Sequence, residues 1–289
     1  MKSRSIRRAP LLAALATLLA GCGPARLDSF LYDPLPAPAG GYTLSTDVIP
    51  AAARQDIFVD STDGVKLHVV FVKSSGAHPN VTMLYFHGQT NNIGTSWPRV
   101  ELLYPLGVNL AAVDPRGYGL STGEPSERGI HDDVQAVWDQ LPAKAGVEPA
   151  EFIIYGRSLG AAFAIDLAAV RTPVALVTES AFASIKEMVR DGVYVDLPPG
   201  FVADSRWDNL AKIPGVAAPY LAIHGLADDY VKYQYSQMLT DAHQAAQTAK
   251  TQLELVPGAG HSDNNGPPVI LEARTPGSYV ALLQTFLGL

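Results

Sequence analysis

The segment 152–170 constrains the fold most, because it joins an apolar run to a helical stretch through a tight turn around a serine. Residues 152–155 are apolar or aromatic, which predicts a buried strand. The turn reads Gly156-Arg157-Ser158-Leu159-Gly160, and an alanine-rich stretch then predicts a helix over 159–170. Side chains at the two glycine positions would collide with the neighbouring backbone of such a turn. This context predicts that Ser158 is a nucleophile, and a turn with a capping serine is the alternative.

Short apolar runs alternate with helical stretches along the rest of the chain. Strands are predicted over residues 56–60, 65–72, 81–86, 109–113, 152–155, 174–178, 220–224 and 252–256, and helices over 97–106, 130–140, 159–170, 233–246 and 278–287. This alternation predicts a mainly parallel sheet with helices on both faces, with an antiparallel hairpin at one edge around Asp63-Gly64. Reactive residues are expected at the carboxyl ends of the strands, where ligands bind in such sheets.

Two strand ends supply partners for the serine, which is a poor nucleophile without a base. His261 lies in a glycine-rich loop after the last predicted strand and is the expected base. Asp228, after the preceding strand, is the expected acid that orients the imidazole. Asp229 and Glu179 are the alternatives for the acid. His224 is interpreted as a turn residue.

Backbone N–H groups are needed to stabilise an oxyanion. Leu159, directly after the serine, and Gln89, in the loop after strand 81–86, are the expected donors. His87 is expected to brace that loop, and Arg116 to form a structural ion pair more readily than to bind substrate. The four histidines without such a setting are expected to be solvated: His68, His78, His131 and His243.

Five blocks, in this order, resemble the α/β-hydrolase superfamily, and within it the serine-aminopeptidase-like and lysophospholipase-like group. The blocks are Tyr85-Phe86-His87-Gly88, Asp114-Pro115-Arg116-Gly117-Tyr118-Gly119-Leu120-Ser121, Gly156-Arg157-Ser158-Leu159-Gly160, His224-Gly225-Leu226-Ala227-Asp228 and Gly258-Ala259-Gly260-His261. The resemblance covers about residues 56–287 and implies the α/β-hydrolase fold with a triad in the order serine, acid, histidine. The chain departs from the group at Gln89, where asparagine is common, and at Ala161, where glycine is common.

Residues 184–219 lie where similar proteins insert a lid or small cap. Their larger apolar residues are Met188, Val193, Tyr194, Leu197, Pro198, Pro199, Phe201 and Trp207. Two interpretations stay open, since these residues could line an acyl or aromatic pocket or form the core of a small cap.

The N-terminus resembles a lipoprotein leader. Residues 1–8 are basic, residues 9–20 are apolar but short for a membrane span, and Leu19-Ala20-Gly21-Cys22 resembles a bacterial lipobox. We expect residues 1–21 to be a signal peptide, Cys22 to carry lipid, 22–54 to be a tether and 55–289 to be the hydrolase domain. An ordinary secretory signal is the alternative. Gly23 rather than aspartate favours the periplasmic side of the outer membrane, if the organism has one.

Composition excludes some classes of function. The net charge of −7 argues against nucleic acid as a partner, and the single cysteine excludes an intramolecular disulfide. The acyl transfer expected of a serine triad needs neither a metal nor an organic cofactor, and no His-Glu-x-x-His zinc motif occurs. The expected reaction is hydrolysis of a small-molecule or lipid ester, or a thioester, through an acyl-enzyme. The alternatives are an amide-cleaving peptidase and a non-catalytic lipid-anchored binding protein.

Overall fold

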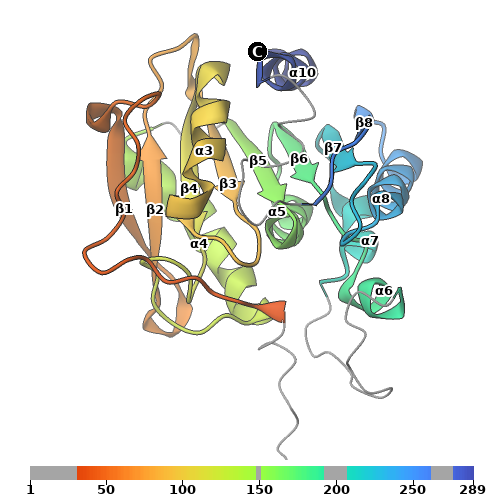
Figure 1. The fold of residues 1–289 in the computed structure, drawn as a ribbon, viewed down its shortest axis with the longest axis horizontal. Coiled ribbons are helices and arrows are strands. Elements are labelled where there is room, and N and C mark those ends of the chain that lie inside the picture. The colour runs from red at the N-terminus through yellow and green to blue at the C-terminus, as the bar shows by residue number, and fades with distance from the viewer. Residues whose placement is uncertain (1–30, 148–150, 192–206, 262–275) are drawn as a thin grey trace, which may run out of the picture.

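The computed structural model describes residues 31–147, 151–191, 207–261 and 276–289. Its centre is one eight-stranded sheet in the order β1-β2-β4-β3-β5-β6-β7-β8 (Figure 1). The strands are β1 (Arg54–Asp60), β2 (Lys66–Val72), β3 (His78–Phe86), β4 (Val108–Asp114), β5 (Glu151–Arg157), β6 (Ala175–Glu179), β7 (Tyr220–Gly225) and β8 (Thr251–Val256). β2 pairs antiparallel with β1 and with β4, and the other neighbours pair parallel. The predicted mainly parallel sheet with an antiparallel edge is confirmed.

Helices cover both faces of the sheet. They are α3 (Ile93–Leu103), α4 (Glu127–Ala145), α5 (Leu159–Val170), α6 (Ile185–Arg190), α7 (Asn209–Lys212), α8 (Tyr233–Ala246) and α10 (Pro276–Leu287). One apolar core lies under α3 and α10, and the other lies under α4, α5 and α8. α5 is buried on nearly all sides, which explains its uniformly apolar sequence.

Two helices begin earlier than the sequence pattern predicts, because polar residues cap them. The helix expected from residue 97 begins at Ile93, after Asn92, whose side chain and that of Thr95 form a capping box. The helix expected from residue 130 begins at Glu127, after a Ser126 cap. The first turn of each helix is set by its polar cap, so the spacing of apolar residues does not indicate where the helix begins.

The strand order reverses around β3. The chain passes from β3 to β4 on one side and then crosses back to β5 on the other side. In register, Phe86 at the end of β3 faces Gly156 near the end of β5. The loops that follow these two strands therefore open at the same edge, where α/β sheets bind ligands.

Residues 31–50, here called the N-terminal strap, lie along the domain. Of the tether expected over residues 22–54, residues 22–30 lie outside the described residues, as does the expected signal peptide over residues 1–21. Leu31, Tyr32 and Ile49 are buried in the strap, and Pro36 forms a bridge with Gly119. No helix of the described residues is long and apolar enough to cross a membrane.

The described part of segment 184–219 belongs to the domain core. Met188 and Trp207 are both buried. Trp207 packs on Phe163 of α5 with ring centroids 5.1 Å apart and donates a hydrogen bond to the Tyr32 hydroxyl at 2.8 Å. Residues 192–206, which include the remaining apolar candidates, lie outside the described residues.

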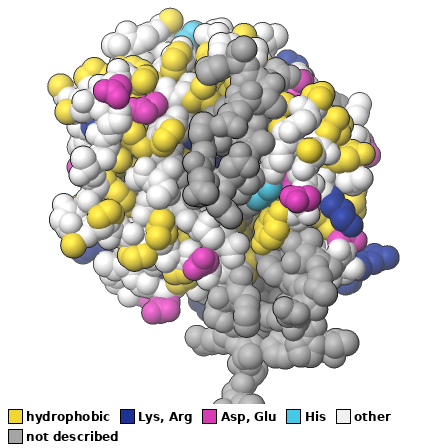
Figure 2. All heavy atoms as spheres, viewed as in Figure 1, with side chains coloured by type: hydrophobic (Ala, Val, Ile, Leu, Met, Phe, Trp, Pro, Cys, Tyr) yellow, Lys and Arg dark blue, Asp and Glu magenta, His cyan; other side chains and the backbone are white. Residues whose placement is uncertain are grey.

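Charged side chains are dispersed on the face of the molecule shown in Figure 2. Acidic and basic groups of the described residues lie among polar and apolar side chains, and no continuous basic band is seen on this face. This distribution accords with the acidic net charge of the chain.

Candidate active site

Ser158 occupies a strained turn between β5 and α5. Its backbone has φ 53° and ψ −119°, a conformation that costs a non-glycine residue roughly 1–3 kcal/mol. Its N–H donates to Glu179 O at 2.8 Å. A Cβ at Gly156 would lie 2.2 Å from Gly160 O, and one at Gly160 would lie 2.2 Å from Phe86 O. The two glycines are therefore required by the close approach of backbone on either side of the serine.

The structure brings His261 to Ser158. The Ser158 hydroxyl lies 3.0 Å from His261 Nε2, and His261 Nδ1 lies 2.8 Å from Asp228 Oδ2. An ionised carboxylate only accepts hydrogen bonds, so Nδ1–H donates to Asp228 and leaves Nε2 free to accept the serine proton. The three residues form the arrangement that a serine nucleophile, a general base and an orienting acid require.

Asp228 is held as an anion. Its Oδ1 accepts hydrogen bonds from the N–H groups of Tyr230, at 3.1 Å, and Val231, at 2.7 Å. Burial by itself raises the pKa of this carboxyl, but hydrogen bonds from His224, His261 and Val231 N–H lower it well below its ordinary value of 3.8. Asp228 can therefore stabilise positive charge on the His261 ring at neutral pH.

His224 is a strand residue, and its interpretation as a turn residue is wrong. It lies on β7, fully buried, with Nε2 2.8 Å from Val231 O and 3.3 Å from Asp228 Oδ2. Its Nδ1 lies 2.7 Å from Ser236 Oγ. His224 and Asp228 belong to the same His-Gly-x-x-Asp block of the sequence. The four-residue spacing alone, however, does not indicate that the His224 side chain contacts the Asp228 carboxylate.

The two alternative acids lie elsewhere. Asp229 is exposed at the surface. Glu179 is buried below the Ser158 turn, where it forms ion pairs with Arg99 and Arg157. Its Oε2 accepts hydrogen bonds from Tyr155 at 2.5 Å and Tyr279 at 3.1 Å. Burial opposes its ionisation, but the two arginines hold the pKa of Glu179 below its ordinary value. Asp228 is therefore the carboxylate that the structure brings to His261.

One expected oxyanion donor directly follows Ser158, and the other belongs to a loop that approaches Ser158. Leu159 begins α5, so its N–H belongs to the helix N-terminus that follows the serine. Gln89 follows Gly88, and a Cβ at Gly88 would lie 3.6 Å from Ser158 Cβ. The loop after β3 is therefore close enough to the serine to take part in an oxyanion site.

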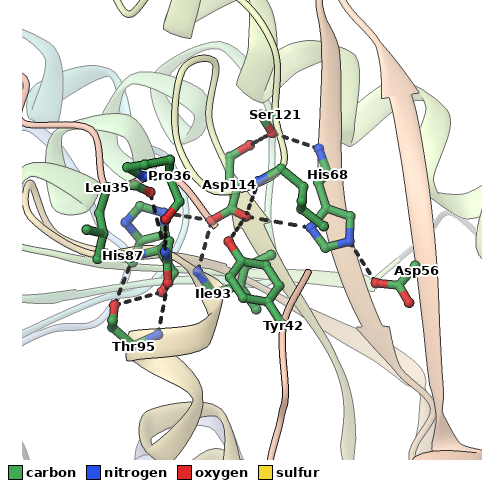
Figure 3. Close-up of polar contacts among 12 residues, drawn as sticks. Leu35, Pro36, Tyr42, Asp56, His68, His87, Ile93, Thr95, Asp114 and Ser121 are labelled. Atoms are coloured by element: carbon green, nitrogen blue, oxygen red, sulfur yellow. Dashed lines mark hydrogen bonds and ion pairs between the residues drawn. The ribbon is translucent and has the colours of Figure 1, made fainter. Parts of the chain in front are cut away.

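Asp114 at the end of β4 holds both ends of that loop (Figure 3). Its Oδ1 lies 3.3 Å from His87 Nε2 and accepts a hydrogen bond from Ile93 N–H at 2.9 Å. Its Oδ2 accepts one from the Tyr42 hydroxyl of the strap at 2.6 Å. His87 braces the loop as predicted, and the strap contributes to the same anchor.

Two histidines that were expected to be solvated are buried, and that prediction is wrong for them. His68 lies between Asp56, 2.7 Å from its Nε2, and Asp114, 3.6 Å from its Nδ1 (Figure 3). His243 lies with Nδ1 2.6 Å from Thr251 Oγ1 and Nε2 3.1 Å from Ala218 O. Each of these histidines contacts at least one residue from a distant segment, Asp114 for His68 and Ala218 for His243, so local composition gave no sign of their burial.

Arg116 forms the structural ion pair that the sequence predicts. Its Nε donates to Asp133 Oδ2 at 2.9 Å and its Nη2 donates to Oδ1 at 2.7 Å, with the guanidinium almost fully buried. This bidentate pair fixes the loop after β4 on α4.

The described residues contain no group of three or more His, Cys, Asp or Glu side chains arranged to hold a metal ion.

A family model described as "Serine aminopeptidase, S33" matches residues 77–203. The matched part contains the Gln89 loop, Ser158 and Glu179, and it ends before Asp228 and His261.

The chain is similar in sequence to known proteins and in fold to solved structures. An uncharacterised protein of Mycobacterium tuberculosis is 34% identical over 239 residues, which cover 82% of this chain and 80% of that protein. The alpha/beta hydrolase domain-containing protein WAV2 of Arabidopsis thaliana is 30% identical, covering 77% of this chain and 78% of that protein. The structure of an esterase of Pyrococcus furiosus superposes with a TM-score of 0.66 at 19% identity, covering 88% and 98% of the two chains. The chain belongs to the α/β-hydrolase superfamily and is a hydrolase by family.

Proposed function

We propose that this hydrolase cleaves carboxylic esters, including lipid esters or thioesters, through an acyl-enzyme on Ser158. The observation that carries the proposal is the continuous row of contacts from the Ser158 hydroxyl through His261 to the Asp228 carboxylate. Both distances lie within the range of roughly 2.6–3.2 Å in which a base activates a nucleophile. This arrangement favours catalysis over a purely binding role.

The proposed reaction has two halves. Ser158 Oγ attacks the substrate carbonyl while His261 Nε2 takes the hydroxyl proton. His261 then gives this proton to the leaving alcohol or thiol as its bond to the acyl carbon breaks. Water next gives a proton to His261 and attacks the acyl-enzyme, and Ser158 leaves with that proton. Asp228 stays ionised throughout and stabilises the imidazolium.

Backbone groups stabilise the oxyanion that each half of the reaction forms. Leu159 N–H and Gln89 N–H are the proposed donors, and the N-terminus of α5 adds its partial positive charge. Loss of one such donor in an enzyme typically costs roughly 3 kcal/mol of transition-state stabilisation.

Cleavage of amides is the second candidate, because the matching family model is described as a serine aminopeptidase. An aminopeptidase needs an anionic group for the free amine of its substrate. Asp228 is engaged with His261 and Glu179 with two arginines, whereas Asp229 is exposed next to the site. The similar fold of an esterase favours esters. Faster turnover of aminoacyl amides than of p-nitrophenyl esters, lost in Asp229→Asn, would establish the peptidase instead.

Labelling with a fluorophosphonate probe tests the nucleophile. Ser158→Ala should abolish labelling and ester hydrolysis. Ser180→Ala is a matched control, because Ser180 is also a buried serine with positive φ at a strand end, and its hydroxyl has no hydrogen-bond partner among the described residues. Labelling of Ser158→Ala as strong as that of wild type would exclude Ser158. A wild-type protein that neither labels nor hydrolyses any ester would support the binding-protein alternative.

We also propose that Cys22 carries lipid and holds the enzyme at a membrane of the cell envelope. The proposal rests on the lipobox-like Leu19-Ala20-Gly21-Cys22. Two signals or several acyl chains are needed for stable anchoring, and a lipoprotein cysteine receives several. Membrane fractionation after metabolic labelling with palmitate should give a labelled, sedimenting wild type and an unlabelled Cys22→Ser protein. If the wild-type protein is unlabelled and sediments to the same extent as Cys22→Ser, the lipid anchor is excluded.

A further inference from the structure

Arg157 occupies the variable position of the nucleophile turn, between Gly156 and Ser158. Its side chain is almost fully buried at the end of β5. Its Nη2 donates a hydrogen bond to His261 O at 2.5 Å, across 104 residues of sequence. The residue next to the nucleophile thus contacts the backbone of the proposed base.

The other side of the guanidinium is fixed by a buried anion. Arg157 Nε lies 3.3 Å from Glu179 Oε1. Glu179 is in turn paired with Arg99 of α3 and bonded to the hydroxyls of Tyr155 and Tyr279. These partners come from α3, β5 and α10, so the anion cannot move without disturbing both the sheet and two helices. Glu179 with Arg99, Tyr155 and Tyr279, here called the Glu179 platform, therefore forms a rigid support for the Arg157 guanidinium.

The guanidinium also lies against the loop that carries the proposed oxyanion donor. A Cβ at Gly88 would lie 3.3 Å from Arg157 Nη1. Arg157 thus lies close to both the loop after β3 and the loop after β8. One side chain contacts both loops that must be placed correctly around the serine.

Carbonyl groups of the loop after β8 accept hydrogen bonds from two other segments. Ala259 O accepts a hydrogen bond from Ala227 N–H at 2.9 Å, and His261 O accepts the one from Arg157. The ring of His261 must at the same time keep Nε2 3.0 Å from the serine and Nδ1 2.8 Å from Asp228. A displacement of about 1 Å in such a site can reduce the rate by roughly 10²-fold. The hydrogen bond from the charged Arg157 guanidinium to His261 O is well suited to prevent such a displacement of His261.

We propose that Arg157 is a positioning residue, which holds the His261 main chain on the Glu179 platform so that the imidazole stays aligned between Ser158 and Asp228. The proposal rests on the proposed function, since it assigns a role toward His261 as the base. A lysine at this position keeps the charge but lacks the planar fork of the guanidinium, so it cannot keep both the ion pair with Glu179 and the hydrogen bond to His261 O in the same geometry. Charge and alignment can therefore be separated by substitution.

The decisive comparison is Arg157→Lys against Arg99→Lys. Both substitutions keep a cation on the same carboxylate, but Arg157 and not Arg99 has a contact to His261 in the structure. With a p-nitrophenyl ester, we expect kcat of Arg157→Lys to fall by roughly 10–100-fold with KM almost unchanged, as misalignment of a reacting group predicts. Arg99→Lys should keep kcat within about threefold, because the contact to the base is intact. The rate of fluorophosphonate labelling should fall in parallel with kcat.

Chemical rescue gives a readout that a merely structural role would not move. Arg157→Ala leaves a buried gap between Glu179 and His261 O, and added guanidinium should raise the kcat of this variant in a saturable manner. Sodium chloride or urea at the same concentration should not raise the kcat of Arg157→Ala. Guanidinium should not raise the kcat of Ser158→Ala.

Ser158→Ala, measured in parallel, separates the two proposals. If Ser158→Ala is inactive while Arg157→Lys equals wild type, the positioning role is wrong and the proposed function stands. Equal losses in Arg157→Lys and Arg99→Lys would also overturn the positioning role, because the effect would then come from the Glu179 platform. If Ser158→Ala keeps wild-type activity, the proposed function itself is wrong.

Discussion

Asp228 and Asp229 are adjacent carboxylates with different surroundings. Asp228 is buried and accepts hydrogen bonds from two backbone N–H groups and from His261, whereas Asp229 is exposed. The backbone bonds and the histidine contacts lower the pKa of Asp228 against the effect of burial. Local environment, and not residue type, therefore distinguishes the acid from its neighbour.

Replacing the acid should cost far more activity than replacing its neighbour. Asp228→Asn keeps the shape but offers an amide that stabilises the wrong imidazole tautomer, so kcat should fall by roughly 10⁴-fold, as in other serine triads. Asp229→Asn should change ester kcat by less than about threefold, as an exposed substitution does. Steady-state kinetics of the two variants on one ester test this. A similar loss in both would contradict the assignment of Asp228.

The glycines of the nucleophile turn should be sensitive to a single methyl group. Gly160→Ala places Cβ 2.2 Å from Phe86 O, which forces backbone to move and should destabilise the fold by about 2 kcal/mol or more. Gly277→Ala on α10 is the control, since nothing lies within 4 Å of its Cβ and alanine favours a helix. Thermal denaturation should show a lower midpoint for Gly160→Ala and an unchanged or higher one for Gly277→Ala.

At the level of elements, strands and their ends could be predicted from sequence, whereas contacts between elements could not. Each reactive residue follows an apolar run, so Ser158, Asp228 and His261 could be assigned to one sheet edge from local patterns. The burial of His68 depends on Asp114 of another strand, and the role of Arg157 depends on a carbonyl 104 residues away. No local pattern encodes such pairs, because they arise from packing between distant segments.

The buried His68 of β2 makes the stability of this edge depend on pH. Burial opposes protonation, but the carboxylates of Asp114 and Asp56 raise the pKa of His68 above its ordinary value of 6.5. A raised folded-state pKa stabilises the fold below pH 6.5, and this contribution is lost as the pH rises through the higher folded value.

His68→Gln removes this titration and tests its sign. Wild type should lose a few degrees of melting temperature between pH 6 and the alkaline side of the transition, and His68→Gln should lose less over the same range. His243, whose pKa burial lowers, remains in both proteins and cancels in the comparison. A steeper decline in the variant than in wild type would contradict the raised pKa.

At the level of the whole molecule, the strap is the part that composition described least well. Its prolines and glycines resemble a linker, yet Leu31, Tyr32 and Ile49 are buried against the domain. Asn92, which caps α3, donates through Nδ2 to Leu35 O at 3.3 Å and to Pro36 O at 3.2 Å. The strap therefore joins the loop after β3 through carbonyl groups, which any residue type provides and which sequence composition cannot reveal.

Removing the strap should affect both stability and catalysis. A chain that begins at residue 51 loses three buried apolar side chains, each contributing roughly 1.5–3 kcal/mol, and its melting temperature should fall by about 10 °C or more relative to a chain that begins at residue 31. Its kcat should fall as well, because the loop that carries Gln89 loses its contacts to Leu35 O and Pro36 O and the Tyr42 bond to Asp114.

Tyr42→Phe in the full chain separates the two effects. It removes one hydrogen bond to Asp114 and keeps the buried apolar residues of the strap, so it should lower stability by only about 1 kcal/mol while reducing kcat more than KM. Circular dichroism melts and ester kinetics are measured on the chains that begin at residues 31 and 51, and on Tyr42→Phe beside the wild-type full chain. If the chain that begins at residue 51 melts and turns over like the one that begins at 31, the strap has no structural part in the site, and contacts outside the strap, such as those of Asp114 with His87 and Ile93, are sufficient to hold the loop after β3.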